Sequence, residues 1–207
     1  MHEMISISVV KRLPRYYRYL GGLLENGVNR VSSKELSQLM DITASQIRQD
    51  LNNFGCFGQQ GYGYNVGMLK DEIGKILGLT RVYKLVIIGA GNLGQALAAN
   101  SRFAMRGFEI TGLFDIDPRL IGKEVSGIKI MHAAGLGPFL VQDKTDIAVF
   151  TMPGENAQDV ADCVLASGVR GIWNFTNVDL KSTGHIKVQS VHLTDSLMTL
   201  SYMLNDG

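Results

Sequence analysis

Residues 84–94 read Lys-Leu-Val-Ile-Ile-Gly-Ala-Gly-Asn-Leu-Gly, an apolar run that breaks into three spaced glycines. The pattern predicts a strand that feeds a glycine loop, followed by a helix over residues 92–104. In such a loop Gly89 allows a tight turn, Gly91 lets the backbone approach a pyrophosphate, and Gly94 lets the helix pack close to the strand. Backbone amides at the start of the helix would face the phosphates. We therefore expect a dinucleotide-binding loop made of Gly89, Ala90, Gly91, Asn92, Leu93 and Gly94.

The chain after this loop indicates which dinucleotide is bound. A second strand is expected over residues 109–114, and it ends in Asp115, 21 positions after Gly94. A carboxylate there accepts hydrogen bonds from the adenosine ribose and repels the 2′-phosphate of NADP. This favours NAD(H), with Ile116 and Asp117 beside the adenosine half. The alternative is a structural turn with a surface aspartate, because glycine turns are common in a chain with 24 glycines.

The remaining second half alternates strands and helices. Apolar segments at residues 128–131, 146–151 and 171–175, with a helix over 156–167, predict a doubly wound, Rossmann-like parallel sheet of the α/β class. Dinucleotides lie across the carboxyl ends of such strands. The nicotinamide half is therefore expected near Thr151, Met152, Pro153, Asn174 and Phe175. Met152 and Phe175 have a plainer alternative, as ordinary core residues.

Composition sets limits on the class of protein. A chain of 207 residues can hold one large domain or two small ones, and its net charge of +1 requires any nucleic-acid surface to come from local segregation of charge. Cys56 and Cys163 are too few and too far apart for a disulfide scaffold or a zinc site, which fits a reducing cytosol. There is no signal-peptide pattern and no apolar run near the roughly 20 residues that span a bilayer. We expect a cytoplasmic protein that has no metal site.

The first fifty residues predict three helices. Apolar residues at spacings of three and four over residues 9–24 indicate an amphipathic helix, which Pro14 would begin or kink and Gly27 would end. Ser32 and Thr43 each open a segment with the spacing of a capping box. Two short capped helices joined by a tight turn have the proportions of a helix-turn-helix. The outward amide, hydroxyl and guanidinium groups of the third helix suit a major groove, although a solvated helix face has the same composition.

Residues 57–64 add weight to the DNA-binding interpretation. They alternate aromatic residues, glycines and amides, which predicts a short β-hairpin with Gln60 and Gly61 at a tip narrow enough for a minor groove. Between residues 5 and 64 there are seven basic against four acidic side chains. This excess is modest, so we expect a salt-sensitive contact that depends on two copies acting together. A further amphipathic helix over residues 69–77 would form the hinge to the second domain.

The C-terminal segment predicts self-association. In residues 194–204, with Thr194 as the expected cap, apolar residues lie on almost every side of the helix, so something else must cover it. Exchange of this helix, including Leu197 and Tyr202, between subunits of a two-fold dimer would meet that need. The dimer would also supply the paired reading heads that a palindromic site requires.

Four N-terminal segments closely resemble the Rex family of bacterial redox-sensing transcriptional repressors. They are residues 10–20 (VKRLPRYYRYL), 32–36 (SSKEL), 43–51 (TASQIRQDL) and 58–64 (GQQGYGY), and the glycine loop follows them. The resemblance covers nearly the whole chain. It implies a winged helix-turn-helix domain over residues 1–80, a Rossmann NAD(H) domain over 81–192, and a swapped helix over 193–207 that lodges between the partner's two domains.

The resemblance also bears on the switch between states. Several relatives carry an aspartate near the start of the C-terminal helix that exchanges partners between two states, whereas this chain has His192 there and retains the expected partner Arg18. His192 could introduce a pH dependence or simply pack in an interface.

We therefore hypothesise a homodimeric repressor that is not an enzyme and that reads the NADH/NAD⁺ ratio, with NADH releasing double-stranded palindromic operator DNA. The alternative is a small oxidoreductase or a binder of another nucleotide such as coenzyme A, although no histidine has a catalytic neighbourhood and little chain is left for a substrate domain. The expected DNA contacts are Lys11, Arg12, Arg15, Tyr16, Ser32, Ser33, Lys34, Thr43, Ser45, Gln46, Arg48, Gln49, Gln59, Gln60, Gly61 and Tyr62.

Overall fold

The computed structural model describes residues 6–52, 58–59, 62–181 and 186–205. The chain divides into two compact units, Met1–Arg81 and Val82–Gly207. The expected tip of the hairpin, Gln60 and Gly61, lies outside the described residues.

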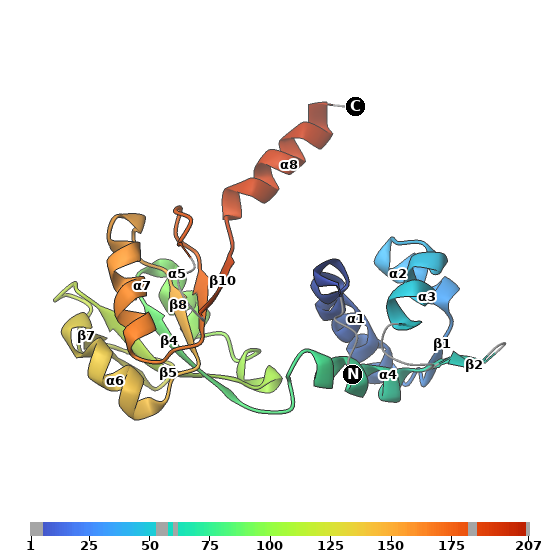
Figure 1. Ribbon diagram of the computed structural model, residues 1–207, viewed down its shortest axis with the longest axis horizontal. Helices are drawn as coiled ribbons and strands as arrows, with labels where there is room; N and C mark the ends of the chain where they lie inside the picture. Colours follow the sequence, from blue (N-terminus) through green and yellow to red (C-terminus); the bar gives the residue numbers. More distant parts are fainter. Residues whose placement is uncertain (1–5, 53–57, 60–61, 182–185, 206–207) are drawn as a thin grey trace. The chain divides into compact units, whose positions relative to one another are not determined.

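The first unit packs helices around a small antiparallel sheet whose strand order is β1-β3-β2 (Figure 1). Its core is formed mainly by fully buried side chains of α1 and α4 and of the α2–α3 pair, among them Leu13, Leu20, Leu36, Ile47 and Leu69. In chain order the elements are α1 (Ile7–Glu25), β1 (Arg30–Val31), α2 (Ser33–Met40), α3 (Ala44–Asn52), β2 (Gly58–Gln59), β3 (Gly63–Asn65) and α4 (Val66–Ile76). The predicted winged helix-turn-helix is confirmed.

Helix ends in this unit follow local sequence signals. Ser32 forms a full capping box with Glu35, and the Thr43 hydroxyl accepts a hydrogen bond from the Gln46 amide at 3.1 Å. Gly27 has a φ of +73°, and its amide donates to Leu24 at the end of α1. Helix α1 begins before Pro14 and continues through it, so of the two alternatives at Pro14 the helix start is excluded.

The second unit is built on a seven-stranded sheet with the order β10-β9-β8-β4-β5-β7-β6. The strands are β4 (Tyr83–Ile88), β5 (Phe108–Asp115), β6 (Glu124–Val125), β7 (Ile128–His132), β8 (Ile147–Phe150), β9 (Gly171–Asn174) and β10 (Lys187–Ser190). All pairings are parallel except that of β6 with β7. The order runs outward in opposite directions from β4 and β8, so the topological switch point lies between these two strands. The predicted doubly wound sheet is confirmed.

Helices cover both faces of this sheet. Residues of α6 (Leu136–Asp143) and α7 (Ala157–Ala166) pack with one face of the central strands, and α5 (Asn92–Ala98) contributes to the cluster on the opposite face (Figure 1). Helix α5 is shorter than the predicted span of residues 92–104. The Asn100 side chain accepts a hydrogen bond from the Arg102 amide at 3.1 Å, a local bond that competes with helix continuation. Helix α6 and strands β1, β6 and β10 have no counterpart in the sequence prediction.

The C-terminal helix α8 (Leu193–Asn205) has no buried residue. Thr194 lies inside it, and the Asp195 amide donates to the carbonyl of His192. The prediction that Thr194 caps this helix is therefore wrong by two positions, because His192 is the residue that precedes it. Apolar side chains on α8 are more than half exposed, as at Leu197 (64%) and Tyr202 (67%).

Candidate functional site

The glycine loop lies at the switch point of the sheet. Gly89 follows β4 with a φ of +102°, and a Cβ added there would stand 2.6 Å from the backbone nitrogen of Met152, which follows β8. A Cβ on Gly94 would overlap the carbonyl oxygen of Gly89 and crowd the Thr151 hydroxyl. These two glycines are therefore required by the fold, because the loop, α5 and the end of β8 approach too closely for any side chain.

Gly91 differs from its two neighbours. A Cβ on Gly91 would meet no described atom within 4 Å, and its φ of −71° is open to any residue. Nothing among the described residues explains a glycine there. The open space above its backbone is the room that a closely approaching pyrophosphate needs, so this position fits a dinucleotide.

Asp115 braces the same loop. Its carboxylate accepts hydrogen bonds from the Ala90 amide at 2.6 Å and from the Asp117 amide at 2.8 Å. Each carboxylate oxygen still has a lone pair for a further donor. Asp115 thus lies beside the loop, half-buried at the end of β5, with acceptor capacity for two ribose hydroxyls.

The residues expected at the nicotinamide half separate into two groups. Thr151 donates to the carbonyl of Gly89 at 2.6 Å and so supports the loop. Asn174 is fully buried, donates to the Val178 carbonyl and accepts from Thr176, which makes it a scaffold of the loop after β9. Met152 and Phe175 are partly buried against the two core clusters, which agrees with the alternative that they are ordinary core residues.

A cavity of about 600 Å³ lies at the carboxyl ends of β8 and β9. It is lined by Pro153, Gly154, Glu155, Asn177 and Val178, of which only Pro153 belongs to the predicted set. The other four residues follow the ends of β8 and β9 by a few positions. This proximity to a strand end is the sequence signal from which they could have been predicted. Gly154 has a spatial reason to be glycine, because a Cβ there would overlap the Asn177 side chain.

In the first unit a buried carboxylate joins α3 to α1. Asp50 is fully buried and accepts from Arg12 Nε at 2.7 Å and Nη2 at 2.6 Å, from the Tyr16 hydroxyl at 3.0 Å, and from Gln46 Nε2 at 2.8 Å. Burial alone would raise the pKa of Asp50, but these hydrogen bonds, Arg12 first, hold the pKa below its usual value. Burial, followed by the charge of Asp50, raises the pKa of Tyr16.

Three predicted DNA contacts therefore have internal partners. Tyr16 is fully buried, so the expectation that it contacts DNA does not fit this structure. Arg12 and Gln46 are partly exposed, but their polar atoms are engaged by Asp50. Sequence reasoning did not assign Asp50 a role, because its bond to Arg12 spans 38 residues. The spacing of Gln46 and Asp50, four apart on one helix, was the available signal.

The remaining candidates for DNA contact lie on α3, at the start of α2, on α1 and beside β3. Arg48 donates to the Ser33 hydroxyl at 3.3 Å and so joins the two helices. Arg15 donates to the Met40 carbonyl at 2.6 Å, at the end of α2. Exposed side chains of the predicted set are Lys11, Arg15, Lys34, Thr43, Ser45, Arg48, Gln49 and Tyr62, and Ser32 and Ser33 are half-buried.

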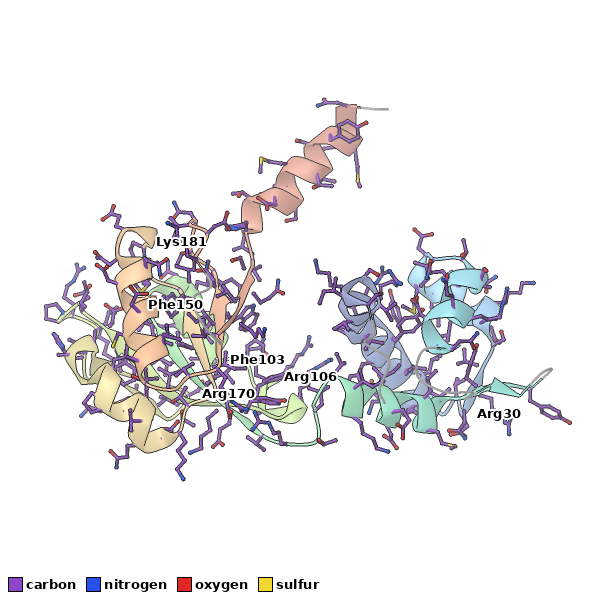
Figure 2. All side chains as sticks on the ribbon, in the orientation of Figure 1. Arg30, Phe103, Arg106, Phe150, Arg170 and Lys181 are labelled. Carbon is purple, nitrogen blue, oxygen red and sulfur yellow. The ribbon has the colours of Figure 1, made fainter. Side chains whose placement is uncertain are left out.

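Arg30 is an exposed cation that sequence reasoning missed. It is labelled in Figure 2, and its guanidinium lies 5.7 Å from the centre of the Tyr62 ring. It also donates to the Tyr62 carbonyl at 3.4 Å. An arginine held against the start of β3 places a positive charge at the base of the wing.

The expected switch residues lie in different units. Arg18 is exposed in the first unit and stands 5.3 Å from the Tyr19 ring centre. His192 lies before α8, with its Nε2 3.3 Å from the Asp179 carboxylate.

The described residues bring together no group of three or more His, Cys, Asp or Glu that could hold a metal ion. Among the helices in the described part of the chain, none combines the length and apolarity needed to cross a membrane.

Comparison with known proteins gives matches to both units. Residues 4–52 match a family model described as a putative DNA-binding protein N-terminus, and residues 80–178 match a model described as a CoA binding domain. The chain is 52% identical to a redox-sensing transcriptional repressor Rex of Clostridioides difficile strain 630, over 100% of this chain and 98% of that protein. It is 54% identical to the Rex of Clostridium kluyveri, over 98% of this chain and 96% of that protein.

Solved structures match over the same extent. The structure of RSP in complex with β-NAD⁺ and operator DNA has a TM-score of 0.93 and 50% identity, and covers 99% of this chain and 94% of that chain. RSP in complex with β-NADH has a TM-score of 0.90 and 48% identity, and covers 99% and 96%. A further structure, with a TM-score of 0.90, names RSP as a Rex-family repressor.

Proposed function

The chain belongs to the Rex family of redox-sensing transcriptional repressors, and from this premise we propose that it acts as a homodimer whose hold on operator DNA is released by NADH. It is a DNA-binding repressor that senses the NADH/NAD⁺ ratio, and its cofactors are NADH and NAD⁺. The observation that carries this conclusion is the match over nearly the full length of the chain to a repressor crystallised with both NAD⁺ and operator DNA.

We propose that the loop and the end of β5 hold the adenosine diphosphate half of the cofactor. Gly91 leaves space for the pyrophosphate, and Asp115 has lone pairs for the ribose hydroxyls. Ala90, Asn92 and Leu93 would contribute backbone contacts, with Ile116 and Asp117 beside the adenosine.

The nicotinamide half would lie near Pro153 and the cavity at the ends of β8 and β9. The two cofactor forms differ by one positive charge and by planarity of the ring. Contact with Pro153 and Val178 on the cavity wall would favour the neutral reduced form, because apolar side chains do not stabilise a cation, whereas contact with the Glu155 carboxylate would favour the oxidised form. The protein responds only to the extent that its two states differ in affinity for the ligand.

DNA contacts are proposed on the exposed face of α3, the start of α2 and the wing. Thr43, Ser45, Arg48 and Gln49 would face the major groove or its phosphates, and Ser32, Ser33 and Lys34 would meet the backbone. The wing would contribute Gln59, Gln60, Gly61 and Tyr62, and the structure adds Arg30 as a candidate. Lys11 and Arg15 on α1 are proposed as backbone contacts, and Arg12 and Gln46 as supports held by Asp50.

Self-association is proposed through α8. The helix exposes apolar side chains that one chain leaves uncovered. The second unit also carries an apolar cavity of about 350 Å³, lined by residues that include Phe103, Phe108, Ile147 and Trp173 (Phe103 is labelled in Figure 2). Exchange of α8 between two chains would cover apolar surface that is exposed in a single chain.

Three further proposals complete the assignment. The functional division is residues 1–80 for DNA, 81–192 for NAD(H) and 193–207 for dimerisation. The protein is not an enzyme, which is supported by relatives named as repressors, and it acts in the cytoplasm, where a repressor of a bacterial chromosome meets DNA.

Coenzyme A is a second candidate ligand, because residues 80–178 match a model described as a CoA binding domain.

Fluorescence anisotropy on genomic fragments selected for binding tests the proposal. We expect saturating NADH to weaken DNA binding at least about tenfold, equal amounts of NAD⁺ or coenzyme A to have little effect, and Asp115→Ala to lose the NADH response while it retains DNA binding. DNA affinity that is unchanged at saturating NADH would refute the proposal. A response to coenzyme A alone would support the second candidate.

A further inference from the structure

We propose that Asp117 is a cofactor-specificity residue, which excludes the 2′-phosphorylated cofactor NADP(H) by holding the Arg119 guanidinium that would otherwise bind the phosphate. This inference rests on the proposed function, because it concerns the adenosine end of the same site. It goes beyond the repulsion by Asp115, since it assigns a role to a second carboxylate and to a cation.

A continuous set of hydrogen bonds links the ribose-binding carboxylate to this cation. The Asp117 amide donates to Asp115 at 2.8 Å, and the Arg119 amide donates to Asp117 at 2.9 Å. The Arg119 side chain then returns to Asp117, with Nε at 3.0 and 3.1 Å from the two carboxylate oxygens and Nη2 at 2.7 Å. The loop after β5 thus presents Asp115, Asp117 and Arg119 as one hydrogen-bonded group.

The electrostatics of this group oppose a phosphate. Hydrogen bonds from Arg119 lower the pKa of Asp117 to about 2, so the carboxylate is charged at neutral pH. The Arg119 charge is matched by Asp117, and Asp115 leaves the group with net negative charge. A 2′-phosphate would therefore meet the Asp115 carboxylate, which has no cationic partner in this group, and a guanidinium whose charge is matched by Asp117 and whose Nε and Nη2 already donate to it.

Arg119 is nevertheless well placed to bind a phosphate once released. Its side chain is 86% exposed, so its guanidinium is accessible to a phosphate once the Asp117 carboxylate is removed. A guanidinium suits phosphate oxygens as well as it suits a carboxylate. In dinucleotide sites of this fold, an arginine near the strand-end acid is the group that accommodates a 2′-phosphate.

A purely structural role for Asp117 makes a different prediction. The Asp117 carbonyl accepts from the Leu120 and Ile121 amides, so residues 117–121 form a tight turn. If Asp117 only shaped this turn, its substitution would weaken NADH and NADPH equally. If it restrains Arg119, substitution would change the ratio of the two affinities.

Nicotinamide fluorescence titrations with NADH and NADPH on the full-length protein test the proposal. In an Asp115→Asn background, we expect Asp117→Asn to raise the ratio of NADPH affinity to NADH affinity about fivefold, the effect of one surface charge contact. Adding Arg119→Gln should abolish that gain. Lys123→Gln is the matched control, because Lys123 also acts on Asp117 electrostatically and the gain should survive its removal.

The outcomes separate this inference from the proposed function. A gain that persists after Arg119→Gln, or no change in the NADPH to NADH ratio in variants that still bind NADH, would overturn the role of Asp117. A wild-type protein that binds neither cofactor would refute the proposed function and this inference with it. Unchanged thermal unfolding midpoints would exclude misfolding as the cause of any difference.

Discussion

Substitution of Asp50 by Asn should destabilise the first unit and leave the stability of the second unit unchanged. Asp50 is fully buried and accepts four hydrogen bonds, two of them from Arg12. Removal of one partner from a buried ion pair costs about 3–5 kcal/mol of unfolding free energy. The Arg12 side chain keeps 26% exposure and can be hydrated, so we expect the lower end, about 3 kcal/mol. For a small unit this lowers the thermal midpoint by roughly 10–20 °C.

The chain provides its own probe for the other unit. Its one tryptophan, Trp173, lies in β9 of the second unit, so tryptophan fluorescence follows that unit while far-ultraviolet circular dichroism also follows the helices of the first. Asp50→Asn should lower the dichroism transition and leave the tryptophan transition in place. Asp41→Asn, which removes an exposed carboxylate from the same unit, is the matched control. Equal stability of the Asp50 and Asp41 variants would refute the reasoning.

The same pair predicts a pH dependence. Because the pKa of Asp50 is lower in the folded state, its stabilising effect is full above the unfolded pKa of about 3.9 and is lost as pH falls through the folded value. The difference in unfolding free energy between wild type and Asp50→Asn should therefore shrink below about pH 4. A difference that stays constant at lower pH would contradict this assignment.

Two further predictions concern the cofactor loop and the C-terminal helix. Gly91→Ala should leave the thermal midpoint within about 1 °C and weaken NADH binding, measured by fluorescence titration. Gly94→Ala should lower both the thermal midpoint and the NADH affinity, because its Cβ overlaps the loop. Equal effects of the two substitutions would contradict the geometry. Leu197→Asp should convert a dimer into a monomer in light scattering after size exclusion, because a charge would enter the proposed interface; a dimer that persists would count against exchange of α8.

The features that could be predicted from sequence are those decided within a few residues. The caps at Ser32 and Thr43 and the stop at Gly27 each depend on a side chain or φ angle within four positions. The alternation of apolar runs and helices likewise predicted the parallel sheet. Resemblance then supplied the family, which spacing alone did not reveal.

Features that depend on distant residues escaped prediction. From the sequence alone, the polar side chains of Arg12 and Gln46 suggest DNA contacts. The structure shows that both donate hydrogen bonds to the buried Asp50. Asn174 sits at a strand end, as expected for a ligand contact, yet its amide is used by Val178 and Thr176. In both cases a polar side chain satisfies a buried group, and burial is a property of the folded chain.

Helix α8 carries its apolar side chains without burying any of them in its own chain. A helix of this length is marginal by itself in water, so in the proposed dimer its order is linked by mass action to the abundance of the polypeptide. Dilution would then unfold the arm and separate the two DNA-reading units at the same time. Occupancy of operator DNA would then depend on the amount of the protein in the cell as well as on the NADH/NAD⁺ ratio. The reason is that the concentration of dimer rises with the square of the monomer concentration.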